Sequence, residues 1–97
     1  MPGFELSSDA ELDLDSIFDY TLATWGVRQA GRYLEELENC FRLLAGNQQI
    51  GVPHAGAIPG LRRFEHGKHS IFYAQPGERI RIVRILHQRM VPDLSWE

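Results

Sequence analysis

The sequence contains only one cysteine, Cys40, among 97 residues, so no disulfide can form within the chain. Cys40 falls inside a helical apolar pattern, which favours a buried, unreactive thiol in a reducing compartment. No apolar run approaches the roughly 20 residues of a membrane-spanning helix. The first residues have neither the basic stretch nor the apolar stretch of a signal peptide. Together these absences predict a soluble protein of the cytoplasm.

A strongly basic surface is lacking as well. The formal net charge is −3 at pH 7, and it is unevenly divided. Residues 1–60 hold three arginines and nine acidic residues, whereas residues 61–97 hold seven basic and four acidic residues. Proteins that grip RNA or the ribosome place many Lys and Arg side chains against phosphate. The composition therefore disfavours such a protein, and it predicts that the two halves present different charge to partners.

The length and composition are those of one globular domain. A chain of 97 residues with 43% hydrophobic and 24% charged residues can bury a core and fold unaided. The sequence shows no internal repeat, no low-complexity segment and nothing resembling a linker. We therefore expect residues 1–97 to form a single domain.

The first part of the chain predicts a short strand followed by a helix. Alternating apolar and acidic residues favour a short edge strand over residues 3–7. Ser8 is the expected N-cap of the helix, because Glu11 three residues later would complete a capping box. Gly26 is expected to end this helix. The helix carries one apolar stripe: Leu14, Ile17, Phe18, Thr21, Leu22 and Trp25.

A second helix is expected directly after Gly26. Tyr33 and Cys40 widen its apolar face, and residues 46–47 end it. Two amphipathic helices joined by one or two residues must fold back as an αα-hairpin. The apolar seam of the second helix recurs at alternating spacings of three and four: Val27, Ala30, Leu34, Leu37, Phe41 and Leu44.

The second half of the chain predicts a sheet. Residues 47–60 are rich in Gly, Pro and Gln and indicate a loop. Three alternating runs follow, over residues 61–65, 70–75 and 79–87, with turn residues in both gaps. Short turns imply an antiparallel meander, and the continuously apolar middle of the last run predicts a strand buried on both faces. We expect an α+β domain of order β-α-α-β-β-β, with the helix hairpin packed on one sheet.

Four histidines, His54, His66, His69 and His87, raise the question of a metal site. They have no cysteine partner and do not form the HExxH pattern of a zinc-binding helix. The close pair His66 and His69 straddles Gly67 in a turn, where ligand geometry is not enforced. We expect solvent-exposed turn or strand histidines, with no metal and no cofactor.

A cationic cluster is expected on neighbouring strands: Arg62, Arg63, Arg81, Arg84 and His87. It could hold phosphate or a scissile RNA backbone, with His87 as acid or base. It could instead be a solvated strand face, partly paired with Glu65 and Glu78. A third interpretation is a docking face for an acidic peptide. The residues alone leave these alternatives open.

Other carboxylates and the tryptophans have simpler interpretations. Asp9, Asp13 and Asp15 are expected to stabilise the first helix through its dipole, not to act as an acid–base pair. Trp25 lies on the apolar stripe beside the helix end and is expected to pack in the core. Trp96 stands near the end of the chain, where it either folds back on the domain or contacts a partner.

Helices and strands together carry a characteristic series of residues. On the helices these are Tyr20, Trp25-Gly26, Ala30, Tyr33 and Leu37. On the strands they are Pro59-Gly60-Leu61-Arg62-Arg63, His69-Ser70-Ile71-Phe72-Tyr73 and Ile82-Val83-Arg84-Ile85-Leu86-His87. In this order and spacing, the series resembles the ParE branch of the RelE/ParE toxin superfamily, over about residues 4–90.

The resemblance implies the toxin of a bacterial type II toxin–antitoxin pair, which poisons DNA gyrase without a catalytic activity of its own. It implies a ParD-type antitoxin as partner, with a ribbon-helix-helix DNA-binding part and a disordered tail that folds around the toxin. The hetero-oligomer of the two would repress its own operon. No membrane contact and no sequence-specific nucleic-acid contact by the toxin are expected.

Partner-binding residues are expected on the hairpin, the last strands and the tail. Tyr20, Tyr33 and Phe41 are candidates for an apolar footprint on the antitoxin, with core packing as the alternative for each. The candidate residues for binding antitoxin or gyrase are Tyr20, Tyr33, Arg62, Arg63, Arg81, Arg84, His87, Met90, Leu94 and Trp96.

Two other functions remain open. Toxins of the RelE type resemble this fold but cleave mRNA on the ribosome, with a strongly basic surface and acid–base groups near the last strand. This chain has arginines and His87 roughly there, yet it is net acidic, and Gln88 follows where some of these nucleases place an aromatic. A non-toxic module that only binds antitoxins is the other alternative. The tail departs from the family, since Val91-Pro92 follows Met90 where many relatives place an Asp.

Overall fold

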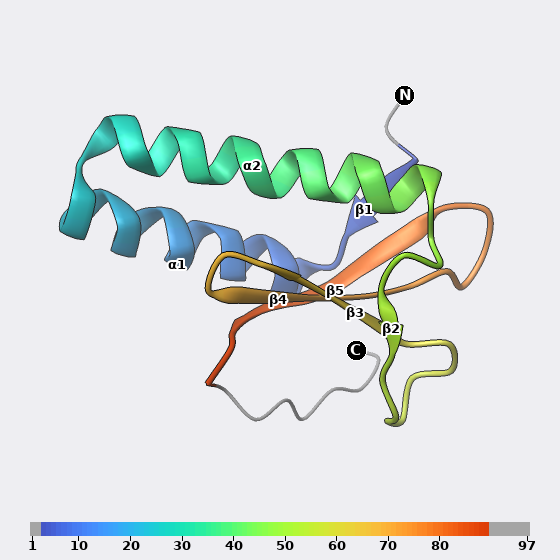
Figure 1. Ribbon diagram of the computed structural model, residues 1–97. Helices are drawn as coiled ribbons and strands as arrows, with labels where there is room; N and C mark the ends of the chain where they lie inside the picture. Colours follow the sequence, from blue (N-terminus) through green and yellow to red (C-terminus); the bar gives the residue numbers. More distant parts are fainter. Residues whose placement is uncertain (1–2, 90–97) are drawn as a thin grey trace.

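The computed structural model describes residues 3–89. Its elements are β1 (Phe4–Leu6), α1 (Ser8–Trp25), α2 (Val27–Gly46), β2 (Val52–Pro53), β3 (Arg62–His66), β4 (His69–Ala74) and β5 (Ile80–His87). Figure 1 shows the two helices side by side over one face of the sheet. The expected α+β architecture, a helix hairpin packed on one sheet, is confirmed.

All strands belong to one five-stranded sheet of order β1-β5-β4-β3-β2. β3, β4 and β5 form the expected antiparallel meander, and β1 lies at an edge, parallel to β5. β2 is the other edge strand, within the segment that the sequence analysis assigned to a loop. A strand of only two residues has no periodicity to detect. Its proline is tolerated because one side of an edge strand is unpaired.

Apolar side chains cover both faces of the central strands. The largest fully buried side chains lie between the helices and the sheet: Leu37, Phe41, Leu44, Ile71, Tyr73, Ile80 and Ile82. A second cluster comprises Ile58, Leu61, Phe72, Ala74, Val83 and Leu86. β5 is thus buried on both faces, as expected. Cys40 lies in the main core, where burial raises the pKa of its thiol, so its expected burial is confirmed.

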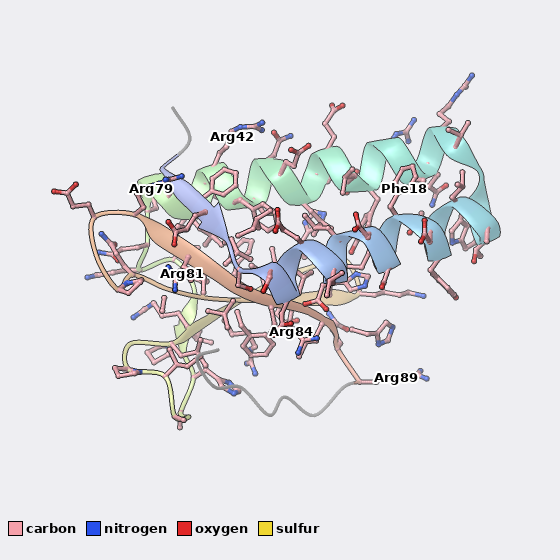
Figure 2. The ribbon with its side chains drawn as sticks, turned by 180° about the vertical axis from the view of Figure 1, so that it is seen from behind. Phe18, Arg42, Arg79, Arg81, Arg84 and Arg89 are labelled. Carbon is pink, nitrogen blue, oxygen red and sulfur yellow. The ribbon has the colours of Figure 1, made fainter. Side chains whose placement is uncertain are left out.

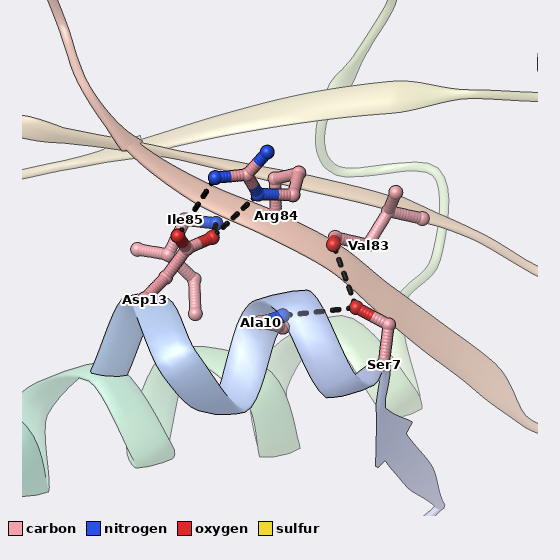
Figure 3. A network of polar contacts seen from close by, with 6 residues as sticks. All are labelled: Ser7, Ala10, Asp13, Val83, Arg84 and Ile85. Carbon is pink, nitrogen blue, oxygen red and sulfur yellow. Dashed lines mark hydrogen bonds and ion pairs between the residues drawn. The ribbon is translucent and has the colours of Figure 1, made fainter. Parts of the chain in front are cut away.

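The first helix begins one residue earlier than expected, and its N-cap is Ser7 instead of Ser8. The Ser7 hydroxyl accepts a hydrogen bond from the Ala10 amide at 3.0 Å and donates one to the Val83 carbonyl at 2.7 Å (Figure 3). Ala10 is the third helical residue, so Glu11 stands one position too late for a capping box. Tertiary structure determines which serine caps the helix, because the Ser7 hydroxyl bonds both the first turn of α1 and the backbone of β5.

The hairpin turn lies beyond the sheet. Gly26 ends α1 as expected, with a φ of 94° that favours glycine. Helices of 18 and 20 residues extend about 27–30 Å at 1.5 Å per residue, and Figure 1 shows their connecting turn past the end of the strands. Trp25 and Val27 are therefore 64% and 72% exposed. The expectation that Trp25 packs in the core is wrong.

Neither helix has the character of a membrane span. Within residues 3–89, none is both long and apolar enough to cross a bilayer.

The segment between α2 and β3 is tied to the sheet by polar contacts. The Tyr73 hydroxyl accepts from the Gly51 amide at 2.9 Å and donates to the Gln48 carbonyl at 2.7 Å. The Arg62 guanidinium donates to the Gly51 carbonyl at 2.7 and 3.0 Å and to the Gln49 carbonyl at 3.1 Å. A Cβ at position 51 would collide with the Tyr73 hydroxyl. This close approach explains why glycine occupies the position.

Candidate functional site

The cationic residues do not lie on adjacent strands, contrary to expectation. β4 separates β3, with Arg62 and Arg63, from β5, with the other members of the cluster. Arg63 and Arg84 flank Phe72 in one cross-strand row. Figure 2 shows Arg81 and Arg84 spaced along β5. The meander imposes this separation, because its middle strand lies between the other two.

Carboxylates of β1 and α1 hold the two arginines of β5. Arg81 donates to Glu5 at 2.7 Å, and Arg84 donates to both oxygens of Asp13 at 2.8 and 2.9 Å. The backbone amide of Ile85 also donates to Asp13, at 2.9 Å from Oδ2. Figure 3 shows Asp13 together with Arg84 and Ile85. Bidentate charge-assisted pairs of this kind are strong and directional. Asp13 therefore has a tertiary role beyond the helix dipole that the sequence indicated.

The arginines of β3 have different surroundings. Arg63 Nε lies 3.0 Å from Glu65 Oε2, but no hydrogen bond forms from this nitrogen. The contact is an ion pair of poor directionality on a partly exposed surface, where such pairs contribute little. Its expected partner Glu65 is confirmed. Within residues 3–89, no ion pair to Glu78 forms, so the expectation that Glu78 pairs with an arginine of the cluster is wrong. The backbone carbonyl of Glu78 accepts a hydrogen bond from the Gln75 side chain at 3.2 Å.

Three histidines gather with Tyr33 at one end of the sheet. The Tyr33 hydroxyl hydrogen-bonds with His69 Nδ1 at 2.7 Å and donates to the His66 carbonyl at 3.2 Å. His66 Nε2 lies 2.9 Å from Glu36 Oε1, and the rings of His69 and His87 meet edge-on at 5.8 Å. Burial raises the pKa of Tyr33 and, with the charges of His87 and His66, lowers the pKa of His69. Hydrogen bonds of the Tyr33 hydroxyl thus join α2 to the ends of β3 and β4.

These histidines are half-buried, so the expectation of solvent exposure is wrong. His54 is half-buried too. Its ring packs edge-on against Phe72 of the second hydrophobic cluster, with 5.1 Å between the ring centroids. The sequence could not show this, because the burial comes from side chains distant along the chain. In the part of the chain that the structure describes, no group of three or more His, Cys, Asp or Glu side chains is placed to hold a metal ion.

One pocket brings two of the predicted site residues together. It encloses about 360 Å³ beside α1 and the ends of β4 and β5. Its lining residues are Asp13, Ser16, Ile17, Tyr20, His69, Ile85, Leu86 and His87. We call it the tyrosine–histidine pocket. Tyr20 is 70% exposed at its mouth, while Ile17, Ile85 and Leu86 are buried. Such an apolar floor with a few polar groups suits an apolar or aromatic side chain of a partner.

The remaining predicted residues lie elsewhere. Tyr33, Arg62, Arg63 and Arg81 are not part of the tyrosine–histidine pocket. Phe41 is completely buried, so core packing, and not an exposed apolar footprint, applies to this residue. Met90, Leu94 and Trp96 lie outside the described residues. The sequence analysis missed the α1 wall of the pocket. The spacing of its α1 residues, at positions 13, 16, 17 and 20, is the signal that could have revealed this helix face.

Comparison with known proteins gives a family match over most of the chain. The family model described as "ParE toxin of type II toxin-antitoxin system, parDE" matches residues 4–92. The chain belongs to the ParE toxin family. The resemblance drawn from the sequence is thereby confirmed.

Relatives of this ParE-family chain come from several bacteria. It is 39% identical over 90 residues to "Toxin ParE1" of Caulobacter vibrioides, covering 93% of each chain. It is 43% identical over 89 residues to "Toxin ParE1" of Mycobacterium tuberculosis, covering 91% of each. A solved structure, "Chromosomal ParDE TA system from P. aeruginosa", matches with a TM-score of 0.74 and 26% identity, covering 87% of this chain and 92% of that one.

Proposed function

We propose that this ParE-family toxin inhibits DNA gyrase in the cytoplasm, without a catalytic activity of its own. We further propose that residues 1–97 act as one domain and that a ParD-type antitoxin neutralises it. The hetero-oligomer would repress the operon through the ribbon-helix-helix part of the antitoxin. Membership of the ParE family and the likeness to the ParDE structure from P. aeruginosa support the proposal.

The ion pairs that the two arginines of β5 form with carboxylates are the observation that supports a toxin without catalytic activity. Cleavage of RNA requires cationic groups aimed at the charge that develops on phosphate. Arg84, the arginine of β5 that is nearest in sequence to His87, instead binds both oxygens of Asp13. The lining of the tyrosine–histidine pocket includes the Asp13 carboxylate and no arginine or lysine. This chemistry supports the binding of a protein partner over a scissile phosphate.

The proposed contact surface centres on Tyr20. An exposed tyrosine offers a large, rigid, amphipathic contact at low entropic cost, and the adjoining pocket gives a partner side chain a place to bury. We propose direct partner contacts for Tyr20 and His87. Tyr33, Arg62, Arg63, Arg81 and Arg84 would support the surface by fixing the strands, and Met90, Leu94 and Trp96 remain proposed contacts of the tail.

Expression of the chain without antitoxin, followed by a supercoiling assay with the purified protein and gyrase, tests the proposal. We expect growth arrest with a DNA-damage response and loss of supercoiling. Growth arrest with intact supercoiling and rapid loss of translation would identify an RNA-cleaving toxin instead. In that case His87→Ala would abolish transcript cleavage while ribosome binding persists. A harmless, normally folded product would identify a module that only binds antitoxin.

A further inference from the structure

His69 and His87 lie directly opposite each other, at one end of the neighbouring strands β4 and β5. They are partners in the antiparallel register. The next pair along is hydrogen-bonded, because the Gln88 amide donates to the Lys68 carbonyl at 2.9 Å. Hydrogen-bonded and non-hydrogen-bonded pairs alternate between antiparallel strands, so His69 and His87 form a non-hydrogen-bonded pair. The Cα atoms of such a pair approach to about 4.5 Å, which brings the two side chains close together.

The spacing of the two rings fits the ligation of one metal ion. The centroids of the His69 and His87 rings are 5.8 Å apart, and the rings meet edge-on. A zinc–imidazole bond measures about 2.1 Å and the ring centroid lies about 1.1 Å behind the nitrogen, so each centroid is about 3.2 Å from the ion. Two such rings are about 5.2 Å apart at a tetrahedral angle and about 6.4 Å apart when they lie on opposite sides of the ion. The observed separation falls within this range.

Tyr33 holds His69 in the form that a metal ligand requires. The Tyr33 hydroxyl donates its one hydrogen to the His66 carbonyl at 3.2 Å and lies 2.7 Å from His69 Nδ1. Its oxygen therefore accepts from Nδ1–H, and this tautomer leaves the lone pair of Nε2 available. Metal-binding histidines are commonly oriented by such a contact to their other ring nitrogen. Burial, followed by the charges of His87 and His66, lowers the pKa of His69, which favours the neutral ring that binds a metal ion.

The tyrosine–histidine pocket gives an ion access to both rings, since both histidines line its volume of about 360 Å³. Asp13 lines the pocket too, but its carboxylate is engaged by Arg84 and by the Ile85 amide. His87 Nδ1 accepts from the Arg89 amide at 3.2 Å. That contact is exposed, so water can replace it when a metal ion takes Nε2. The pocket therefore offers two imidazole ligands, and water completes the coordination of the ion.

Two imidazoles in one pocket select a particular class of ion. Zn²⁺, Ni²⁺ and Cu²⁺ bind imidazole, whereas Mg²⁺ and Ca²⁺ prefer oxygen ligands. We propose that His69 and His87 form a two-histidine site for such a transition-metal ion, open to solvent through the pocket. The pair is smaller than a group of three or more ligands, of which residues 3–89 contain none. The inference goes beyond gyrase inhibition and does not rest on it, because metal binding is a property of this chain alone.

Titration of the full-length chain with zinc chloride tests this inference. The chain carries no affinity tag, because a histidine tag would itself bind the ion. Calorimetry should show one Zn²⁺ bound per chain and no binding of Mg²⁺. Long-range proton–nitrogen NMR spectra should show that Zn²⁺ shifts Nε2 of His69 and His87 and leaves the rings of His54 and His66 unchanged. No detectable binding of Zn²⁺, or shifts centred on His54 or His66, would overturn the proposal.

Matched histidine substitutions separate this site from general attraction of a metal ion to histidine. His69→Gln and His87→Gln should each weaken Zn²⁺ binding at least about tenfold, because each removes one of the two ligands. His54→Gln makes the same change at a half-buried histidine outside the pocket. It should change the affinity by less than about twofold, since separate sites act independently. Equal effects of all three substitutions would show non-specific binding and sink the proposal.

Tyr33→Phe tests the positioning role of the tyrosine. The variant keeps both ligands and removes only the hydroxyl that contacts His69 Nδ1. It should weaken Zn²⁺ binding about tenfold, because the ring is then less well oriented. Thermal melts without metal will verify that each variant folds, and His87→Gln at the end of β5 keeps the test valid if His69→Gln does not fold. The gyrase assay can fail or succeed irrespective of these results.

Discussion

Asp13 and Arg84, 71 residues apart in sequence, are joined by two hydrogen bonds of 2.8 and 2.9 Å. The same carboxylate accepts the Ile85 amide at 2.9 Å. Ile85 lies past the point where β1 pairs with β5, since that pairing ends at Ile82. A side chain of α1 thus takes over the hydrogen bonding that a neighbouring strand would otherwise supply, and it fixes the helix to the strand edge.

Asp13→Ala should lower the free energy of unfolding by about 2–4 kcal/mol. The change removes the carboxylate that satisfies both the Arg84 guanidinium and the Ile85 amide, and the Asp13 side chain is only 13% exposed. Urea denaturation followed by circular dichroism measures the loss. Asp15→Ala, an exposed neighbour on the same helix, is the control and should change stability by less than about 0.5 kcal/mol. Similar losses in both variants would refute the tertiary role of Asp13.

Tyr73→Phe should destabilise the domain by about 1–3 kcal/mol. The buried hydroxyl bonds both the Gly51 amide and the Gln48 carbonyl, and its removal leaves these groups unsatisfied. Tyr20→Phe deletes the same atom from an exposed side chain and serves as control. Thermal and urea denaturation will compare the two. An unchanged midpoint for Tyr73→Phe would show that solvent replaces the lost contacts.

Acidification should weaken the domain through His69. Burial, followed by the charges of His87 and His66, lowers its pKa below the ordinary value of 6.5. The unfolded chain therefore takes up this proton at a higher pH than the folded chain. The contribution is fully present above pH 6.5 and is lost as pH falls from there toward the folded pKa. Wild type should lose more stability than His69→Gln between pH 7.5 and 5.5 in urea melts, and parallel losses would contradict the assignment.

Tyr20→Ala should weaken partner binding about tenfold or more without changing stability by more than about 0.5 kcal/mol. Gyrase supercoiling and titration with a ParD-type antitoxin show which partner is affected. Trp25→Ala is the matched control, because it removes an exposed aromatic from the same helix outside the tyrosine–histidine pocket. If Tyr20→Ala inhibits gyrase and binds the antitoxin as well as wild type does, the tyrosine–histidine pocket is not part of the contact surface.

Deletion of residues 92–97 should reduce growth arrest and leave antitoxin binding intact. The segment contains Leu94 and Trp96, which we propose as contacts to gyrase. Growth of cells that express the truncated chain, together with pull-down of the antitoxin, provides the two readouts. Full toxicity of the truncated chain would show that the tail is dispensable.

The fold was largely predictable because its signals are local. Helical spacing, alternation and turn residues lie within a few positions of one another, and they place both helices and the meander correctly. Contacts between distant residues were not predictable. No local pattern shows that Asp13 pairs with Arg84 or that Ser7, and not Ser8, caps the first helix. Nor does any local pattern show that the helix hairpin extends beyond the sheet and leaves Trp25 exposed. The candidate site was therefore only partly foreseen, as Tyr20 and His87 without the walls of their pocket.

The parallel pairing of β1 with β5 has a consequence for synthesis of the protein. Ribosomes deliver Phe4–Leu6 well before Ile80–His87, at roughly 5–20 residues per second. Until the final strand emerges, the first strand has no neighbour, and Asp13 has no guanidinium to bind. Contacts between the two ends of a chain also form late because loop closure must precede them. An interrupted message therefore releases an unfinished domain, and translation through β5 is required before the folded domain exists.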